Sequence, residues 1–117
     1  MAHLTTHVLD TARGMPAREV TIELHRLAGT ERHHLKTVVT NVDGRTEAPL
    51  LTGEGLETGV YELTFHAGDY LRNSGAALTD PPFLDRVVVR FGVADTARNY
   101  HVPLLLSPFG YSTYRGS

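Results

Sequence analysis

Residues 20–25 have the sequence VTIELH, and this short stretch indicates the kind of fold. Apolar and polar residues alternate along it, a period of two that is typical of a β-strand with one face in the core and one in solvent. Residues 60–66 (VYELTFH) and 87–91 (VVVRF) have a similar character. The chain is therefore predicted to be all-β.

Four more segments extend this prediction to most of the chain. Residues 4–10 and 35–42 are expected to form strands, and a short strand is expected around residues 50–51. Residues 100–106 are nearly all apolar, so both faces of that strand should be covered, and another subunit could supply one cover. Seven or eight short strands separated by turns favour a two-sheet β-sandwich.

One segment, residues 69–74, has a helical character. Asp69 could cap its start and Gly75 could end it. At two turns or fewer, this helix would be a minor addition to a β protein. The 117 residues show no internal repeat or domain boundary, so residues 1–117 are predicted to form a single domain.

Composition excludes several classes of function. The chain has no cysteine, which excludes disulfides, thiolate metal sites and cysteine nucleophiles. Its formal net charge is −2 and it has no long basic run, which argues against nucleic acid as a partner. No apolar stretch is long enough to span a membrane, and no signal peptide is recognisable. We therefore expect a cytoplasmic protein with no membrane partner.

Seven histidines raise the question of a metal site. The spacing gives such a site little support, because neighbouring residues on a strand, such as His33 and His34, point to opposite faces. These two are interpreted as solvated loop residues, and His3, His25 and His66 are interpreted as ordinary surface residues. We expect no metal and no cofactor, although a histidine-based zinc protein remains an alternative.

Three residues are better candidates for chemistry. His7 and His101 lie among apolar neighbours in predicted strands, and a displaced pKa in such a setting suits a general base or acid. The alternative is that each is a buried histidine that braces the sheet. Arg45 follows the Asp43-Gly44 turn, so its guanidinium could form a fork on a planar anion or carbonyl. Its alternative is an ordinary surface charge.

The C-terminal residues 107–117 are rich in aromatic and hydroxyl side chains. Terminal residues are normally frayed and polar. Tyr111 and Tyr114 suggest instead a packed tail, in which Ser117 and its carboxylate would form part of a site.

Three motifs together resemble the transthyretin-related 5-hydroxyisourate hydrolases. Residues 4–10 (LTTHVLD) resemble that family's N-terminal signature, and residues 40–45 (TNVDGR) resemble its arginine motif. Residues 100–108 (YHVPLLLSP) and 111–117 (YSTYRGS) resemble its C-terminal block. Each motif alone is weak, but three in order along nearly the whole chain are specific.

The resemblance implies a transthyretin-like sandwich with one short helix. It also implies hydrolysis of 5-hydroxyisourate to 2-oxo-4-hydroxy-4-carboxy-5-ureidoimidazoline in urate degradation, without a cofactor. Members of the family are homotetramers, dimers of dimers, with active sites at the dimer–dimer interface. The positions that match the family's catalytic residues are His7, Arg45, His101 and Ser117, and those that match its substrate contacts are His7, Arg45 and Tyr114.

Two further alternatives and one departure remain. A transthyretin-like carrier of small molecules would share the fold without the activity, because a fold does not determine its function. A structural sandwich or adhesin would leave the tail unexplained. Asn99 stands where many family members have a histidine, which leaves open any auxiliary role of that position.

Overall fold

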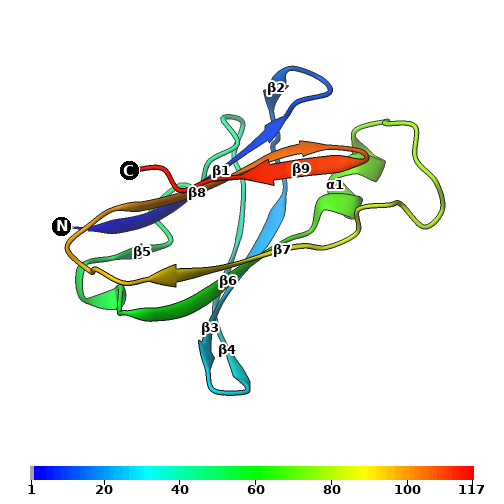
Figure 1. Ribbon diagram of the computed structural model, residues 1–117. Helices are drawn as coiled ribbons and strands as arrows, with labels where there is room; N and C mark the ends of the chain where they lie inside the picture. The colour runs from blue at the N-terminus through cyan, green and yellow to red at the C-terminus, as the bar shows by residue number, and fades with distance from the viewer. Residues whose placement is uncertain (1) are drawn as a thin grey trace.

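Two β-sheets pack face to face in the computed structural model, which describes residues 2–117 (Figure 1). The first sheet has the strand order β2-β1-β8-β9, and β5 also pairs with β1. Its strands are β1 (His3–Asp10), β2 (Met15–Pro16), β5 (Leu51–Thr52), β8 (Tyr100–Ser107) and β9 (Gly110–Thr113). The second sheet has the order β4-β3-β6-β7, made of β3 (Thr21–Ala28), β4 (Glu31–Val39), β6 (Gly59–Phe65) and β7 (Val87–Val93).

All strand pairs are antiparallel except β1 and β8, which run parallel. The parallel pair joins residues that are 96 positions apart in the sequence, with Thr5 opposite His101. Both chain ends therefore lie on the same sheet, and Figure 1 shows them at the same end of the sandwich, opposite α1 (Ala67–Asn73).

The core lies between the two sheets, as the period of two predicts. Every second residue of β1 is buried and the others are half-buried. The largest fully buried side chains come from both sheets and from the segments that join them: Tyr61, Phe65, Leu4, Ile22, Leu24, Leu50, Leu63, Leu71, Leu104, Leu106, Val8 and Val20. The all-β, two-sheet sandwich with one short α-helix that the sequence predicted is confirmed.

Helix α1, the one α-helix within residues 2–117, differs in detail from the prediction. It begins at Ala67 rather than at Asp69, after an N-cap residue, His66, that makes no side-chain capping hydrogen bond. Asp69 lies within the first turn, where it forms an ion pair with Arg72 at 3.1 Å. Gly75 follows the end of the helix with a φ of 81°, a left-handed conformation that glycine adopts without strain.

The predicted strand at residues 35–42 is shifted. The observed β4 begins at Glu31 and ends at Val39, so His33 and His34 lie in a strand and the loop interpretation was wrong. Both are exposed, and β4 as a whole is exposed or half-buried. The start of the strand was missed because the charged residues 31–34 (ERHH) lack the apolar alternation on which the prediction depended.

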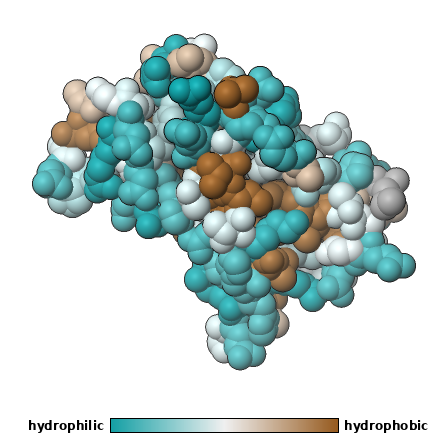
Figure 2. All heavy atoms as spheres, turned by 180° about the vertical axis from the view of Figure 1, so that it is seen from behind, coloured by the Kyte–Doolittle hydropathy of each residue, from teal (hydrophilic) through white to brown (hydrophobic). Residues whose placement is uncertain are grey.

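Viewed from the opposite side, the surface is mostly hydrophilic, with separate apolar patches near the middle of the face (Figure 2). Within residues 2–117, no helix has the length and apolar character needed to cross a membrane.

Candidate active site

The outer face of the first sheet presents two histidines from neighbouring strands. His7 in β1 and His101 in β8 alternate with buried residues, so both side chains point away from the core. The parallel register places Thr5 opposite His101 and His7 opposite Pro103, which makes the two histidines diagonal neighbours. Their ring centroids are 6.5 Å apart.

Arg45 reaches the same place because its segment runs along the free edge of β1. A tight turn closes with the Gly44 N–H donating to the Asn41 carbonyl at 2.9 Å, and Arg45 then forms an isolated antiparallel bridge with His7. Gly44 has a φ of 73°, and a Cβ there would lie 2.3 Å from the Val8 carbonyl oxygen. Only glycine therefore permits this close approach of the turn to β1.

The surroundings of the two histidines favour their neutral forms. The pKa of His7 is below its usual 6.5, mainly because of burial and secondly because of the Arg45 guanidinium. The hydrogen bond with the Asp43 carbonyl acts in the opposite direction and raises the pKa. Burial also lowers the pKa of His101, with further contributions from Arg45 and His7. A nearby cation and partial burial both disfavour imidazolium. Two neutral imidazoles beside one guanidinium can accept a proton and hold a developing negative charge.

The C-terminal tail continues alongside β8. Gly116 pairs with His101 in the same antiparallel register as β9, through hydrogen bonds of 3.3 Å and 2.7 Å between their backbones. Pro103 lacks an N–H and so interrupts this ladder, while the Thr113 hydroxyl donates to the Pro103 carbonyl at 2.7 Å. The tail is packed at Gly116, and Ser117, which is exposed, follows directly.

Tyr114 has a different position from the other candidates. Tyr114 is 58% exposed and is one of the residues around an apolar groove of about 270 Å³ between β7 and β8, together with Phe91 and Tyr100. Beside it, the Arg115 guanidinium lies 4.4 Å from the centre of the Tyr100 ring and donates to the Asn99 carbonyl at 3.3 Å. Four of the five predicted site residues thus lie at or next to the β1–β8 face, and Tyr114 lies at the neighbouring edge.

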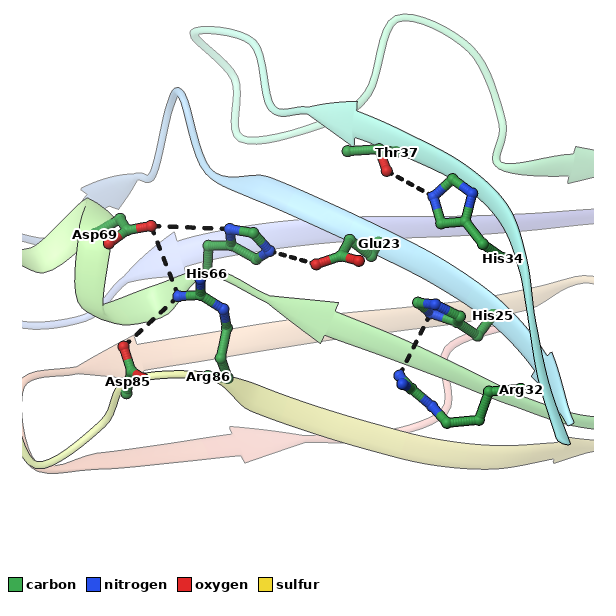
Figure 3. A network of polar contacts seen from close by, with 9 residues as sticks. All are labelled: Glu23, His25, Arg32, His34, Thr37, His66, Asp69, Asp85 and Arg86. Carbon is green, nitrogen blue, oxygen red and sulfur yellow. Dashed lines mark hydrogen bonds and ion pairs between the residues drawn. The ribbon is translucent and has the colours of Figure 1, made fainter. Parts of the chain in front are cut away.

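The second sheet carries a separate group of histidines on its own outer face (Figure 3). His66 contacts Glu23 at 2.6 Å, and His25 lies near Arg32 at 3.5 Å. His25 is only 8% exposed, so its interpretation as an ordinary surface residue was wrong. It pairs across the sheet with buried Glu62, a carboxylate that sequence patterning alone did not single out.

Two contacts at the first site had no clear signal in the sequence. The Thr5 hydroxyl lies 2.8 Å from Nδ1 of His101, and the Asn99 side chain accepts a hydrogen bond from the His3 backbone at 2.9 Å. Both depend on the parallel pairing of β1 with β8, which residue spacing does not reveal. Asn99 therefore ties the start of β1 to the segment that leads into β8.

A hollow of about 160 Å³ lies beside Arg45, lined by Thr5, Thr6 and residues 46–49. Within the described part of the chain, residues 2–117, no three histidine or carboxylate side chains come together as metal ligands would.

Comparison with known proteins fits this geometry. The model of the HIUase/Transthyretin family matches residues 4–116. The chain belongs to that family. Among its relatives, "5-hydroxyisourate hydrolase 2" of Rhizobium meliloti (strain 1021) is 62% identical over 114 residues, which cover 97% of this chain and 95% of the relative. The resemblance inferred from the three motifs is confirmed.

Solved structures give the same fold. A crystal structure of (S)-allantoin synthase matches with a TM-score of 0.94 and 46% identity, covering 99% of this chain. The present chain spans only 44% of that protein. Sea bream transthyretin, in a complex with thyroxine, matches with a TM-score of 0.87 and 30% identity, over 98% of this chain and 95% of transthyretin. The transthyretin-like architecture expected from the sequence is therefore confirmed.

Proposed function

We propose that this chain hydrolyses 5-hydroxyisourate to 2-oxo-4-hydroxy-4-carboxy-5-ureidoimidazoline, a step of urate degradation. The observation that supports this proposal most is that two neutral histidines and one arginine lie together on one face of a sheet. The choice of substrate rests on the high sequence identity to a protein named "5-hydroxyisourate hydrolase 2". The reaction opens a cyclic amide, so it requires an activated water, a group that holds charge on the carbonyl oxygen, and a proton for the leaving nitrogen.

His7 is suited to act as the general base. Its Nε2 lies 2.9 Å from the Asp43 carbonyl oxygen, and a carbonyl can only accept a hydrogen bond. Nε2 of neutral His7 therefore carries the hydrogen, and Nδ1 has a free lone pair. We propose that Nδ1 takes a proton from water while the water oxygen bonds to the ring carbonyl carbon. The same proton then goes to the leaving nitrogen as the C–N bond breaks. General base catalysis of this kind contributes about 10²–10⁴-fold.

Arg45 and the tail complete the proposed site. The Arg45 guanidinium anchors the anionic ring and stabilises the negative charge that develops on the carbonyl oxygen, an effect of about 10²–10³-fold for a comparable donor. Ser117 is proposed to hydrogen-bond the water or the ring, since it directly follows Gly116 beside His101. Tyr114 is also proposed to contact the substrate, since it is exposed and precedes Gly116 by two residues.

The proposal includes a homotetramer, a dimer of dimers, with active sites at the dimer–dimer interface. A hollow of about 160 Å³ beside Arg45 is small compared with ligand pockets of about 300–1,000 Å³, so a second copy facing it would complete the enclosure. β7 and β9 are edge strands that expose Val88 and Tyr111, and open edges favour pairing with another chain. Light scattering tests the tetramer, and cell fractionation tests the cytoplasmic location that we also propose.

A transthyretin-like carrier is not favoured. A channel for an apolar ligand requires an apolar lining, whereas this face presents His7, Arg45 and His101. The chain is also 62% identical to the named hydrolase and 30% identical to the transthyretin that was solved with thyroxine.

The direct test generates 5-hydroxyisourate with urate oxidase and follows its absorbance with and without this protein. Faster decay with formation of 2-oxo-4-hydroxy-4-carboxy-5-ureidoimidazoline, identified by ¹³C NMR, is expected. Decay at the uncatalysed rate would contradict the proposal. Elemental analysis of the active protein tests the expectation that no metal takes part, because stoichiometric zinc required for activity would overturn it.

A further inference from the structure

The second histidine of the site has a polar neighbour that fixes one of its two ring nitrogens. Nδ1 of His101 lies 2.8 Å from the Thr5 hydroxyl oxygen, in a partly buried contact between directly paired residues of β1 and β8. Among residues 2–117, neither Nε2 of His101 nor the Thr5 hydroxyl has another hydrogen-bond partner. Nε2 is therefore the nitrogen that remains available to a ligand.

The tail closes the other side of the same ring. A Cβ on Gly116 would lie 2.9 Å from Cβ, 3.0 Å from Cδ2 and 3.3 Å from Cγ of His101. The glycine backbone thus packs directly against the imidazole and is hydrogen-bonded to the His101 backbone. With Thr5 at Nδ1 and Gly116 beside Cδ2, the ring is held between two strands and has little freedom to turn.

The location of the hydrogen on His101 follows from the Thr5 hydroxyl. If Nδ1–H donated to Thr5, the hydroxyl hydrogen of this half-buried residue would have to bond water, because residues 2–117 provide no other acceptor. If Thr5 donates to Nδ1, both groups are satisfied and the ring hydrogen lies on Nε2. We infer that Thr5 is a positioning residue that holds His101 in its Nε2–H tautomer, so that His101 presents a hydrogen-bond donor to the substrate's carbonyl oxygen.

This inference rests on the proposed function and gives the two histidines complementary roles. His7, whose Nε2–H donates to the Asp43 carbonyl, offers a free lone pair on Nδ1. His101 offers N–H from Nε2. Water loses its proton to His7, and His101 with Arg45 holds the oxygen that becomes negative. Arg45 and His7 are the charged and titratable groups that face His101, and both favour its neutral form.

The tautomer can be read without substrate. Two-bond ¹H–¹⁵N NMR on protein labelled at histidine, at neutral pH, distinguishes protonated from unprotonated ring nitrogens. Comparison with the His101→Asn spectrum assigns the His101 signals. Wild-type His101 should show a protonated Nε2 and an unprotonated Nδ1, and Thr5→Val should show a mixture of the two tautomers. A protonated Nδ1 in the wild type, or an unchanged pattern in Thr5→Val, would overturn the inference.

Kinetics provides the second readout. Thr5→Val keeps a β-branched side chain of similar shape, and its kcat should fall about 10- to 100-fold. The expected loss is smaller than that from removing a hydrogen-bond donor outright, because the variant only misplaces the His101 N–H. KM should change less than kcat, and Thr5→Ser, which restores the hydroxyl, should recover most of the activity. A merely structural Thr5 would instead lower the melting temperature and leave kcat near that of the wild type.

Thr11→Val is the matched control. Thr11 follows β1, and its hydroxyl donates to the Leu106 carbonyl of β8 at 3.1 Å, outside the site. Its kcat should match the wild type, and a loss equal to that of Thr5→Val would contradict a specific role for Thr5. Failure of the proposed function is a different result, because wild-type protein would then leave 5-hydroxyisourate decay unchanged whatever tautomer NMR reports.

Discussion

The two outer faces of the sandwich both carry histidines, but these histidines differ in whether carboxylates also surround them. On the β1–β8 face, His7 and His101 have Arg45 as their charged neighbour, and their pKa values are lowered. On the other sheet, His66 bonds a carboxylate, Glu23, and the hydrogen bond from His66 is the main cause that lowers the Glu23 pKa. Residue type alone therefore does not mark a site.

On the second face, charged side chains form ion pairs with one another. Buried Glu62 accepts hydrogen bonds from Arg32 at 3.0 Å and from Arg90 at 2.8 Å, so these groups leave little capacity for a ligand. Arg86 contacts Asp69 and Asp85, both at 3.6 Å (Figure 3). The first face differs because, within residues 2–117, the exposed Arg45 guanidinium, His7 Nδ1 and His101 Nε2 have no side-chain or backbone hydrogen-bond partner. The comparison teaches that titratable groups left without an ion-pair partner, rather than the number of histidines, identify the face proposed to be reactive.

Replacing one arginine on each face with alanine should give the largest difference in kcat/KM between the two faces. Arg45→Ala removes the cation that holds the developing oxyanion, so kcat/KM for 5-hydroxyisourate should fall about 10²–10³-fold. Arg32→Ala removes an ion pair with Glu62 on the other sheet and should leave kcat/KM within about two-fold, since no reacting group lies there. Steady-state absorbance assays measure both. Equal losses in the two variants would remove the distinction between the faces.

A methyl group on the tail should have the next largest effect. Gly116→Ala places a Cβ against the His101 ring and should displace it, lowering kcat about 10- to 100-fold. Gly92→Ala in β7 is the control, because no atom lies within 4 Å of the added Cβ there. It should leave kcat unchanged. Wild-type activity in Gly116→Ala would contradict this prediction, because it would show that the tail can shift to fit the methyl group without moving His101.

On the second face, the expected effect is on stability rather than on activity. Burial by itself would raise the pKa of Glu62, but hydrogen bonds from Arg90 and Arg32 outweigh it and lower the pKa below the usual 4.5. The folded pKa is thus below the unfolded one, so this stabilisation is present above about pH 4.5 and is lost as pH falls through the folded value.

Glu62→Gln should lower the free energy of unfolding at neutral pH by about 1–3 kcal/mol. It should also weaken the loss of stability in acid, with kcat unchanged. Urea denaturation at several pH values measures both effects. Glu57→Gln, which affects an exposed ion pair with Arg26, should change the stability by less than about 1 kcal/mol. A large loss of kcat in Glu62→Gln would contradict the separation of the two faces.

The smallest expected effect is a shift in titration. Because burial and Arg45 lower the pKa of His7, its folded pKa is below 6.5, and Arg45→Gln should move it upward toward that value. The acid limb of kcat/KM in the wild type should likewise lie below pH 6.5, since the base acts only when neutral. NMR titration of the His7 Cε1 proton measures the shift without activity. His25, whose pKa is lowered by burial and by Arg32 on the other sheet, should titrate identically in both proteins. A parallel shift there would indicate a change beyond the site.

The sequence predicted most of β3, β6 and β7 because their residues alternate and alternation reports burial directly, and it predicted β8 from a nearly continuous apolar run. It missed the start of β4, where the charged residues 31–34 are exposed and carry no alternation. The two-residue strand β2 also gave no signal, since its residues are exposed and only its pairing with β1 defines it.

The site was predictable only through the family motifs. Residue patterns identified His7, His101 and Arg45 as candidates, but by those patterns alone an ordinary structural role explained each of them better. Their proximity depends on the parallel pairing of β1 with β8 and on the bridge between His7 and Arg45, and both are contacts between distant segments. The Thr5 contact with His101 depends on the same pairing, so no local pattern could have revealed it.

The most direct test of the distinction between the two faces compares His7→Asn with His25→Asn in one assay of 5-hydroxyisourate decay, with circular dichroism confirming that both variants are folded. His7→Asn should lower kcat about 10²–10⁴-fold, because the general base is lost. His25→Asn should retain the wild-type kcat, although it changes a more deeply buried histidine. Wild-type activity in His7→Asn, or a comparable loss in folded His25→Asn, would contradict the account.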